Sequence, residues 1–118
     1  MQIKKTGKLF SFCCIAPIII SKKNKYLSSF NKLGSDIGLL FQIADDLIDF
    51  TGSSRIAGKK TGKDKKRGKA TLISLLGHKN AIKYSINIKS KIIKDLKKYG
   101  SKSKKINETL NYILLRNK

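Results

Sequence analysis

The stretch that decides the fold class of this 118-residue chain is residues 34–50, GSDIGLLFQIADDLIDF. Three of the seven acidic residues, Asp45, Asp46 and Asp49, lie close together here. Residues 33–54 contain no lysine or arginine, although the chain has 27 of them. On a helix that advances about 100° per residue, the polar and small residues share a sector about 100° wide, namely Ser35, Gly38, Gln42, Asp45, Asp46 and Asp49. The remaining surface is apolar, which is typical of a buried helix, so we expect the carboxylates to face an internal cleft.

Buried carboxylates persist when they are paired or bound to a metal, and this stretch has no lysine to pair with them. Carboxylates at positions i, i+1 and i+4 are hard oxygen ligands that suit Mg²⁺, so the pattern predicts a divalent-cation site. The alternative is an amphipathic helix with a solvated acidic stripe, which the lack of lysines disfavours. The single histidine, His78, and the adjacent Cys13 and Cys14 lack the spacing of zinc ligands.

Four segments in order resemble the trans-isoprenyl diphosphate synthases. Residues 41–50, FQIADDLIDF, resemble the second aspartate-rich motif of that family. Lys5-Thr6-Gly7 resembles its Lys-Thr motif, and residues 51–77 resemble the loop after the aspartates. The closing Leu115-Arg116-Asn117-Lys118 is similar to the terminus of bacterial farnesyl-type enzymes. The resemblance covers the chain from about Lys5 to its last residue.

The resemblance implies an all-α fold, the C-terminal part of the isoprenoid-synthase helical bundle. The enzymes of the family are much longer, and their Lys-Thr motif lies past the middle of the chain. Residues 1–118 are therefore expected to form one partial domain, without the N-terminal portion that carries the first aspartate-rich motif.

The implied activity is the Mg²⁺-dependent condensation of isopentenyl diphosphate with an allylic diphosphate, of the farnesyl or geranyl type, by an enzyme that is a homodimer in this family. The resemblance assigns Asp45, Asp46 and Asp49 to the metal. It assigns the substrate diphosphates to Lys5, Thr6, Gln42, Lys59 and Lys69, of which the first four are also expected to act in catalysis. Asp64 is expected to stabilise its loop. With only half of the metal cluster present, we expect the activity to be incomplete.

A net charge of +20 favours acidic partners, and it raises a second reading, a basic helical nucleic-acid-binding module. The basic residues are spread over all the predicted helices without an aromatic or recognition-helix pattern, so specific nucleic-acid binding is not expected. A third reading is a non-catalytic partner of a separately encoded N-terminal half.

The basic run at residues 58–69 could be a solvated loop or a diphosphate-binding one. It is not a P-loop, because five residues separate Gly62 from Gly68 where a P-loop has four, and Ala70 stands where serine or threonine is required.

The apolar run Leu9–Ile20 follows a basic start and superficially resembles a signal peptide. No small-residue cleavage site follows it, and it is shorter than the roughly 20 residues of a membrane span, so we predict a buried core helix and no membrane span. Two neighbouring cysteines form no disulfide framework, so we expect a cytoplasmic protein with both cysteines buried. His78 is expected at the surface.

Periodicity and helix-breaking residues predict helices and no strand. The expected helices are residues 2–21, with Pro17 kinking the first or ending it early, residues 26–50, a short one at 70–76, residues 80–99 up to Gly100, and residues 104–116.

Overall fold

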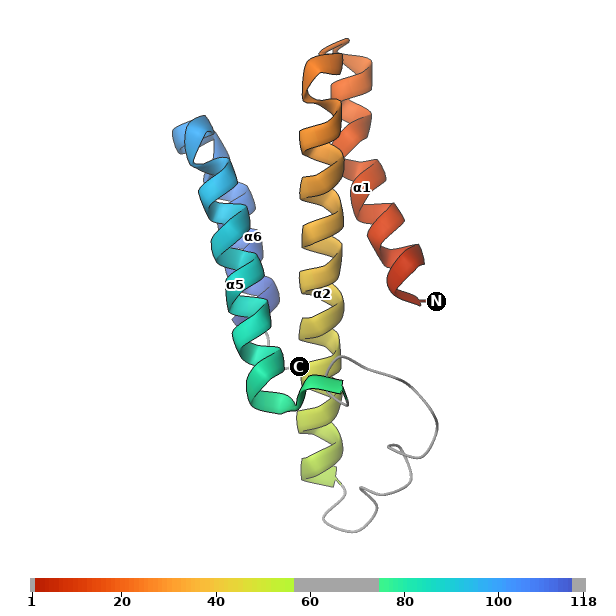
Figure 1. The fold of residues 1–118 in the computed structure, drawn as a ribbon, viewed down its shortest axis with the longest axis vertical. Coiled ribbons are helices and arrows are strands. Elements are labelled where there is room, and N and C mark those ends of the chain that lie inside the picture. The colour runs from red at the N-terminus through yellow and green to blue at the C-terminus, as the bar shows by residue number, and fades with distance from the viewer. Residues whose placement is uncertain (1, 57–74, 116–118) are drawn as a thin grey trace.

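The computed structural model describes residues 2–56 and 75–115, with side chains for 6–50 and 75–115. Its elements are α1 (Gln2–Ile20), η1 (Asn24–Tyr26), α2 (Leu27–Ile56), α5 (His78–Leu96), η2 (Lys97–Ser103) and α6 (Lys104–Leu115). These described ranges contain helices and no strand, as the sequence predicted. In Figure 1, α2 is the central helix, with α1 on one side and the α5–α6 pair on the other.

The first helix matches its predicted range, residues 2–21, and only the early end at Pro17 is wrong. The predicted end of the second helix at residue 50 is wrong as well. Helix α1 continues past Pro17 to Ile20, and the Ser21 N–H donates to the Pro17 carbonyl at 3.0 Å. Helix α2 continues through residues 51–54 to Ile56, where the sequence predicted an end. Glycine and serine weaken a helix by about 1 kcal/mol or less per residue, which does not suffice to stop a long one. Gly100 does interrupt the helical backbone as expected, with φ 60° and ψ −134°.

The core lies between α2 and the α5–α6 pair. Leu40 and Ile43 of α2 are fully buried, and they belong to one apolar cluster with Ile92 of α5 and Leu110 of α6. At one end of this cluster the Phe30 ring meets the Tyr99 ring edge-on, with centroids 6.0 Å apart.

The buried face of α5 agrees only in part with the apolar repeat along residues 80–99, which consists of Ile82, Ile86, Ile92, Ile93, Leu96 and Tyr99. The buried face consists of Ala81, Ser85, Ile88, Ile92 and Leu96. Ile82, Ile86 and Ile93, which the sequence placed on the apolar stripe, are exposed on its flank. The sequence predicted the helical spacing of the apolar residues of α5, but it did not predict which side of the helix is buried.

Helix α1 packs on α2 through small residues. Ser11 is buried there, and its hydroxyl lies 2.9 Å from that of Ser35. The opposite side of α1 is uncovered in the described part of the chain, where Leu9, Phe12, Ile19 and Ile20 are exposed. The prediction of a buried helix over Leu9–Ile20 is therefore wrong, because α1 is covered by α2 on one side only.

The cysteine prediction is likewise wrong for one of the two residues. Cys13 is exposed, whereas Cys14 is half-buried, and both are free thiols. Burial raises the pKa of the Cys14 thiol, and the charge of Cys13 raises it further. A raised pKa disfavours the thiolate that a catalytic cysteine needs, which leaves Cys14 as a packing residue.

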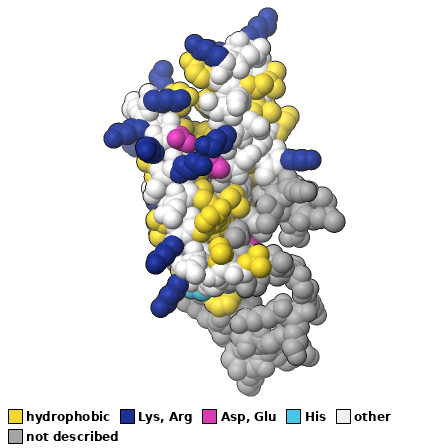
Figure 2. All heavy atoms as spheres, in the orientation of Figure 1, with side chains coloured by type: hydrophobic (Ala, Val, Ile, Leu, Met, Phe, Trp, Pro, Cys, Tyr) yellow, Lys and Arg dark blue, Asp and Glu magenta, His cyan; other side chains and the backbone are white. Residues whose placement is uncertain are grey.

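Among the described residues, no helix is both long and apolar enough to cross a bilayer. Figure 2 shows lysines dispersed over the visible face, with hydrophobic side chains between them and few carboxylates.

Truncating Leu40 should reveal how much the protein depends on the α2 core. Because Leu40 is fully buried, Leu40→Ala should lower the free energy of unfolding by about 2–5 kcal/mol, or abolish cooperative unfolding. Ile20→Ala is the matched control, since Ile20 is 80% exposed, and it should change that free energy by only about 0.5 kcal/mol. Urea denaturation followed by circular dichroism measures both. Equal losses in the two variants would contradict the described core.

Candidate functional site

The three predicted metal-ligand residues lie on α2, beyond the buried Leu40 and Ile43. Asp45 and Asp46 are half-buried, and Asp49 is exposed. The expectation that all three carboxylates face an internal cleft is therefore wrong for Asp49. Asp45 and Asp49 are separated by one turn and share a face, whereas Asp46 points about 100° away from Asp45 around the helix.

Gln42 lies one turn before Asp46 and is hydrogen-bonded to it. The Gln42 Nε2 donates to Asp46 Oδ1 at 3.3 Å. This bond fixes the amide and one carboxylate oxygen relative to each other. This contact agrees with the prediction that Gln42 faces the same way as the aspartates for Asp46.

Thr6 is half-buried near the start of α1, and the next residue, Gly7, touches α2 at Gly38. The backbone of Lys5 is helical. Its side chain lies outside the described residues, as do Lys59, Asp64 and Lys69, so the roles expected for these residues stay predictions. The structure thus brings Gln42 and Asp46 together, and it places the first residues of α1 beside the same helix.

The described side chains meet only part of what a Mg²⁺ site requires. Across residues 2–56 and 75–115, no three histidine, cysteine, aspartate or glutamate side chains form a group that could enclose a cation. The donor chemistry does suit Mg²⁺, because carboxylate oxygens are its preferred protein ligands. A single helix face can contact only one side of a cation, and Mg²⁺ requires octahedral coordination. The aspartates of α2 could therefore supply part of a ligand set, with water, diphosphate oxygens or other carboxylates completing it.

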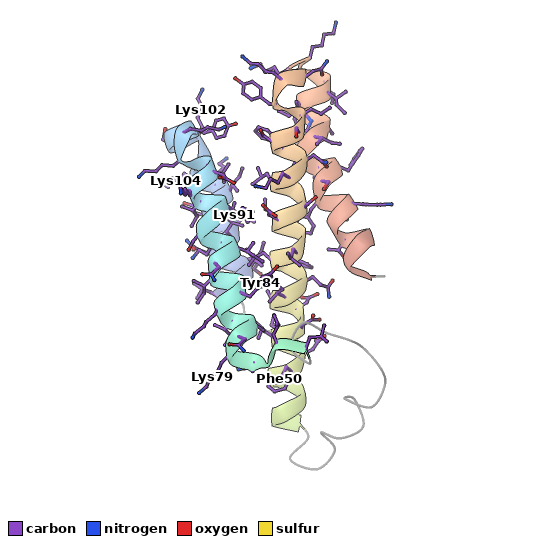
Figure 3. All side chains as sticks on the ribbon, in the orientation of Figure 1. Phe50, Lys79, Tyr84, Lys91, Lys102 and Lys104 are labelled. Atoms are coloured by element: carbon purple, nitrogen blue, oxygen red, sulfur yellow. The ribbon has the colours of Figure 1, made fainter. Side chains whose placement is uncertain are left out.

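An aromatic contact beside the aspartates was missed from the sequence. The rings of Phe50 and His78 are stacked, with centroids 5.1 Å apart and an interplanar angle of 27°. His78 is exposed, as predicted, yet it joins the first turn of α5 to the residue after Asp49. Figure 3 shows Phe50 beside the start of α5. Nothing in the sequence spacing signals this pair, because it depends on how α5 returns to α2.

Comparison with known proteins identifies the class to which this helical chain and its aspartate-bearing helix belong. The polyprenyl synthetase family model matches residues 1–113. The chain belongs to the polyprenyl synthetase family.

Individual relatives agree with this assignment. The chain is 38% identical to a farnesyl diphosphate synthase of Micrococcus luteus over 78 residues, which are 65% of this chain and 27% of the relative. It is 36% identical over 94 residues to the farnesyl diphosphate synthase of Bacillus subtilis, covering 79% of this chain and 31% of the relative. Geranylgeranyl pyrophosphate synthase 4 of Arabidopsis thaliana is 32% identical over 119 residues, covering 99% and 32%.

The chain thus spans about a third of the length of these relatives. No solved structure matches the chain significantly.

Proposed function

We propose that this chain contributes the second aspartate-rich half of a prenyl-transferring site, in which isopentenyl diphosphate condenses with an allylic diphosphate of the farnesyl or geranyl type. The observation that carries the proposal is the hydrogen bond from Gln42 to Asp46 on a helix whose chain belongs to the polyprenyl synthetase family. Residues 1–118 would then form part of one such helical domain, in the cytoplasm, within an assembly that is a homodimer when complete.

The side chains of α2 divide into two roles in this proposal. Asp45, Asp46 and Asp49 would contribute ligands to Mg²⁺, which would supply positive charge beside the diphosphates. Gln42 orients Asp46 through its amide and presents a donor to a diphosphate oxygen. Lys5 and Thr6 from α1, together with Lys59 and Lys69, bind the diphosphates as cationic and hydroxyl donors, and such preorganised donors lower the barrier to ionisation.

The proposal also explains why one helix face is insufficient. The carboxylates of α2 are open to solvent on one side, and an allylic cation must be shielded from water. The exposed apolar side of α1 supports a requirement for further chain around such a site. We therefore propose that prenyl transfer requires a complementary portion, either joined to this chain or separately encoded.

Binding of the metal and a diphosphate can be tested on the 118 residues alone. Mg²⁺ with a non-hydrolysable diphosphate analogue should raise the melting temperature modestly, because a ligand that binds only the folded state stabilises it by mass action. Asp45→Ala should abolish that rise and keep the helix content. Asp36→Ala is the matched control, since it removes the same charge from the opposite face of α2. A rise that persists in Asp45→Ala, or no rise in the parent chain, rejects the proposed site.

Prenyl transfer can be tested in a chimera. In the chimera, this chain replaces the C-terminal portion of the Bacillus subtilis relative. The N-terminal portion of the relative then supplies the part of the fold that this chain lacks. The chimera should condense isopentenyl diphosphate with an allylic diphosphate only when Mg²⁺ is present. Asp45→Ala and Lys59→Ala should each lower turnover by about 100-fold or more, because each removes charge stabilisation of the leaving diphosphate. Product formation from radiolabelled isopentenyl diphosphate is the measurement, with Asp36→Ala again as control. Full turnover in the Asp45→Ala chimera would contradict the assignment.

A specific observation keeps nucleic-acid binding as the second candidate. The lysines of α5, η2 and α6 are nearly all exposed, and Lys79, Lys102 and Lys104 project away from α2 in Figure 3. They are dispersed over these helices, so they fit the release of counterions from phosphates better than the recognition of a base sequence.

The salt dependence of binding distinguishes the two candidates. The chain should bind RNA and DNA weakly and without sequence preference, and this binding should vanish near physiological salt, because it rests on released counterions alone. Fluorescence anisotropy with two unrelated oligonucleotides, each titrated from low to high salt, is the measurement. Submicromolar binding of one oligonucleotide at physiological salt would favour the nucleic-acid function.

A further inference from the structure

The backbones of α1 and α2 touch where α2 carries two glycines one turn apart. A Cβ added at Gly34 would lie 2.5 Å from Ser11 Cα and 2.7 Å from the Phe10 carbonyl oxygen. A Cβ added at Gly38 would lie 2.9 Å from Gly7 Cα. Real Cβ atoms essentially never approach so closely, and the obstacles are backbone atoms that cannot rotate away. The two glycines therefore set the separation of the helices.

The contact at Gly38 lies next to the proposed site on both helices. On α1, Gly7 directly follows Thr6. On α2, Gly38 precedes Gln42 by four residues, or about one turn of helix. Any increase in the Gly7–Gly38 separation therefore moves the Lys5–Thr6 end of α1 away from Gln42 and Asp46. The contact at Gly34 lies one turn farther from the site.

A hydrogen-bonded serine pair fixes the same two helices lengthwise. Ser11 Oγ lies 2.9 Å from Ser35 Oγ and donates to the Asn31 carbonyl at 3.4 Å. Ser11 is buried in this contact. The glycines determine how closely the helices approach, and the serines oppose sliding of one along the other. The start of α1 is thus held in one place relative to the aspartate-bearing turn.

We propose that Gly38 is a positioning residue: by admitting the backbone of Gly7, it sets the distance across which Thr6 and Gln42 hold one diphosphate between two helices. This inference rests on the proposed function, because it gives that same site its spacing. A diphosphate bridges donors only within hydrogen-bond distance, and a misplacement of about 1 Å can cost about 100-fold in a reaction. Gly38 itself touches no substrate in this scheme.

The test compares three glycine-to-alanine variants of the 118-residue chain. Gly38→Ala must push the helices apart beside the site. Gly34→Ala must push them apart more, but one turn farther away. Gly7→Ala is the matched control, because its Cβ would meet nothing within 4 Å. All three gain the same helix propensity, so that effect cancels in the comparison.

Two quantities are measured well below the melting temperature. The first is the affinity for inorganic pyrophosphate with Mg²⁺, by isothermal titration calorimetry. The second is the distance between spin labels at Leu9→Cys of α1 and Lys32→Cys of α2, both exposed positions outside the proposed site, in a background in which Cys13 and Cys14 are replaced by serine. Gly38→Ala should weaken pyrophosphate binding about tenfold and lengthen the label distance, whereas Gly7→Ala should alter neither.

The outcomes separate positioning from mere stability. A structural role alone predicts that Gly34→Ala, with the tighter clash, loses at least as much affinity as Gly38→Ala, and that result would overturn the inference. Parental affinity or an unchanged distance in Gly38→Ala would overturn it as well. If the parent chain does not bind pyrophosphate with Mg²⁺, the proposed function itself fails, and the inference that rests on it fails with it.

Discussion

The structure depends on the packing of other helices on two sides of α2. One side bears Leu40 and Ile43, which are fully buried against α5 and α6. Another side bears Gly34 and Gly38, which bring the α1 backbone into direct contact. The two sides are stabilised by different interactions. The first is stabilised by the removal of large apolar side chains from water, and the second by van der Waals contact between closely packed backbones. Gln42 and the three aspartates are polar residues of the same helix that belong to neither contact.

This division explains why a helix of such poor intrinsic propensity is a single long element. Glycine and serine inside α2 each cost helix stability, and several occur between Leu27 and Ile56. Tertiary packing compensates for that cost, as it does for most helices in proteins. The same glycines that weaken the isolated helix allow α1 to pack closely. The absence of a glycine side chain therefore accounts both for the low helix propensity of α2 and for its close contact with α1.

Membership of the polyprenyl synthetase family and the geometry of α2 support each other, within limits set by chain length. The chain spans about a third of its relatives, and the described residues show a carboxylate face without an enclosing ligand group. One helix can supply one side of a metal site. The uncovered apolar face of α1 is consistent with the same conclusion, because Leu9 and Phe12 need a neighbour that the described residues do not provide. Both observations support the proposal that a complementary portion completes the site.

The sequence by itself determined the all-α class, the family and the residues of the polar face, because these follow from periodicity and from motifs local in the chain. The bond from Gln42 to Asp46 was predictable for the same reason, since residues four apart meet on any helix. Only the tertiary structure decided which flank of α5 is buried, that Asp49 and the apolar side of α1 are exposed, and that Phe50 meets His78. Burial depends on what packs against an element, and the amphipathic pattern of one helix does not say how its neighbours are arranged.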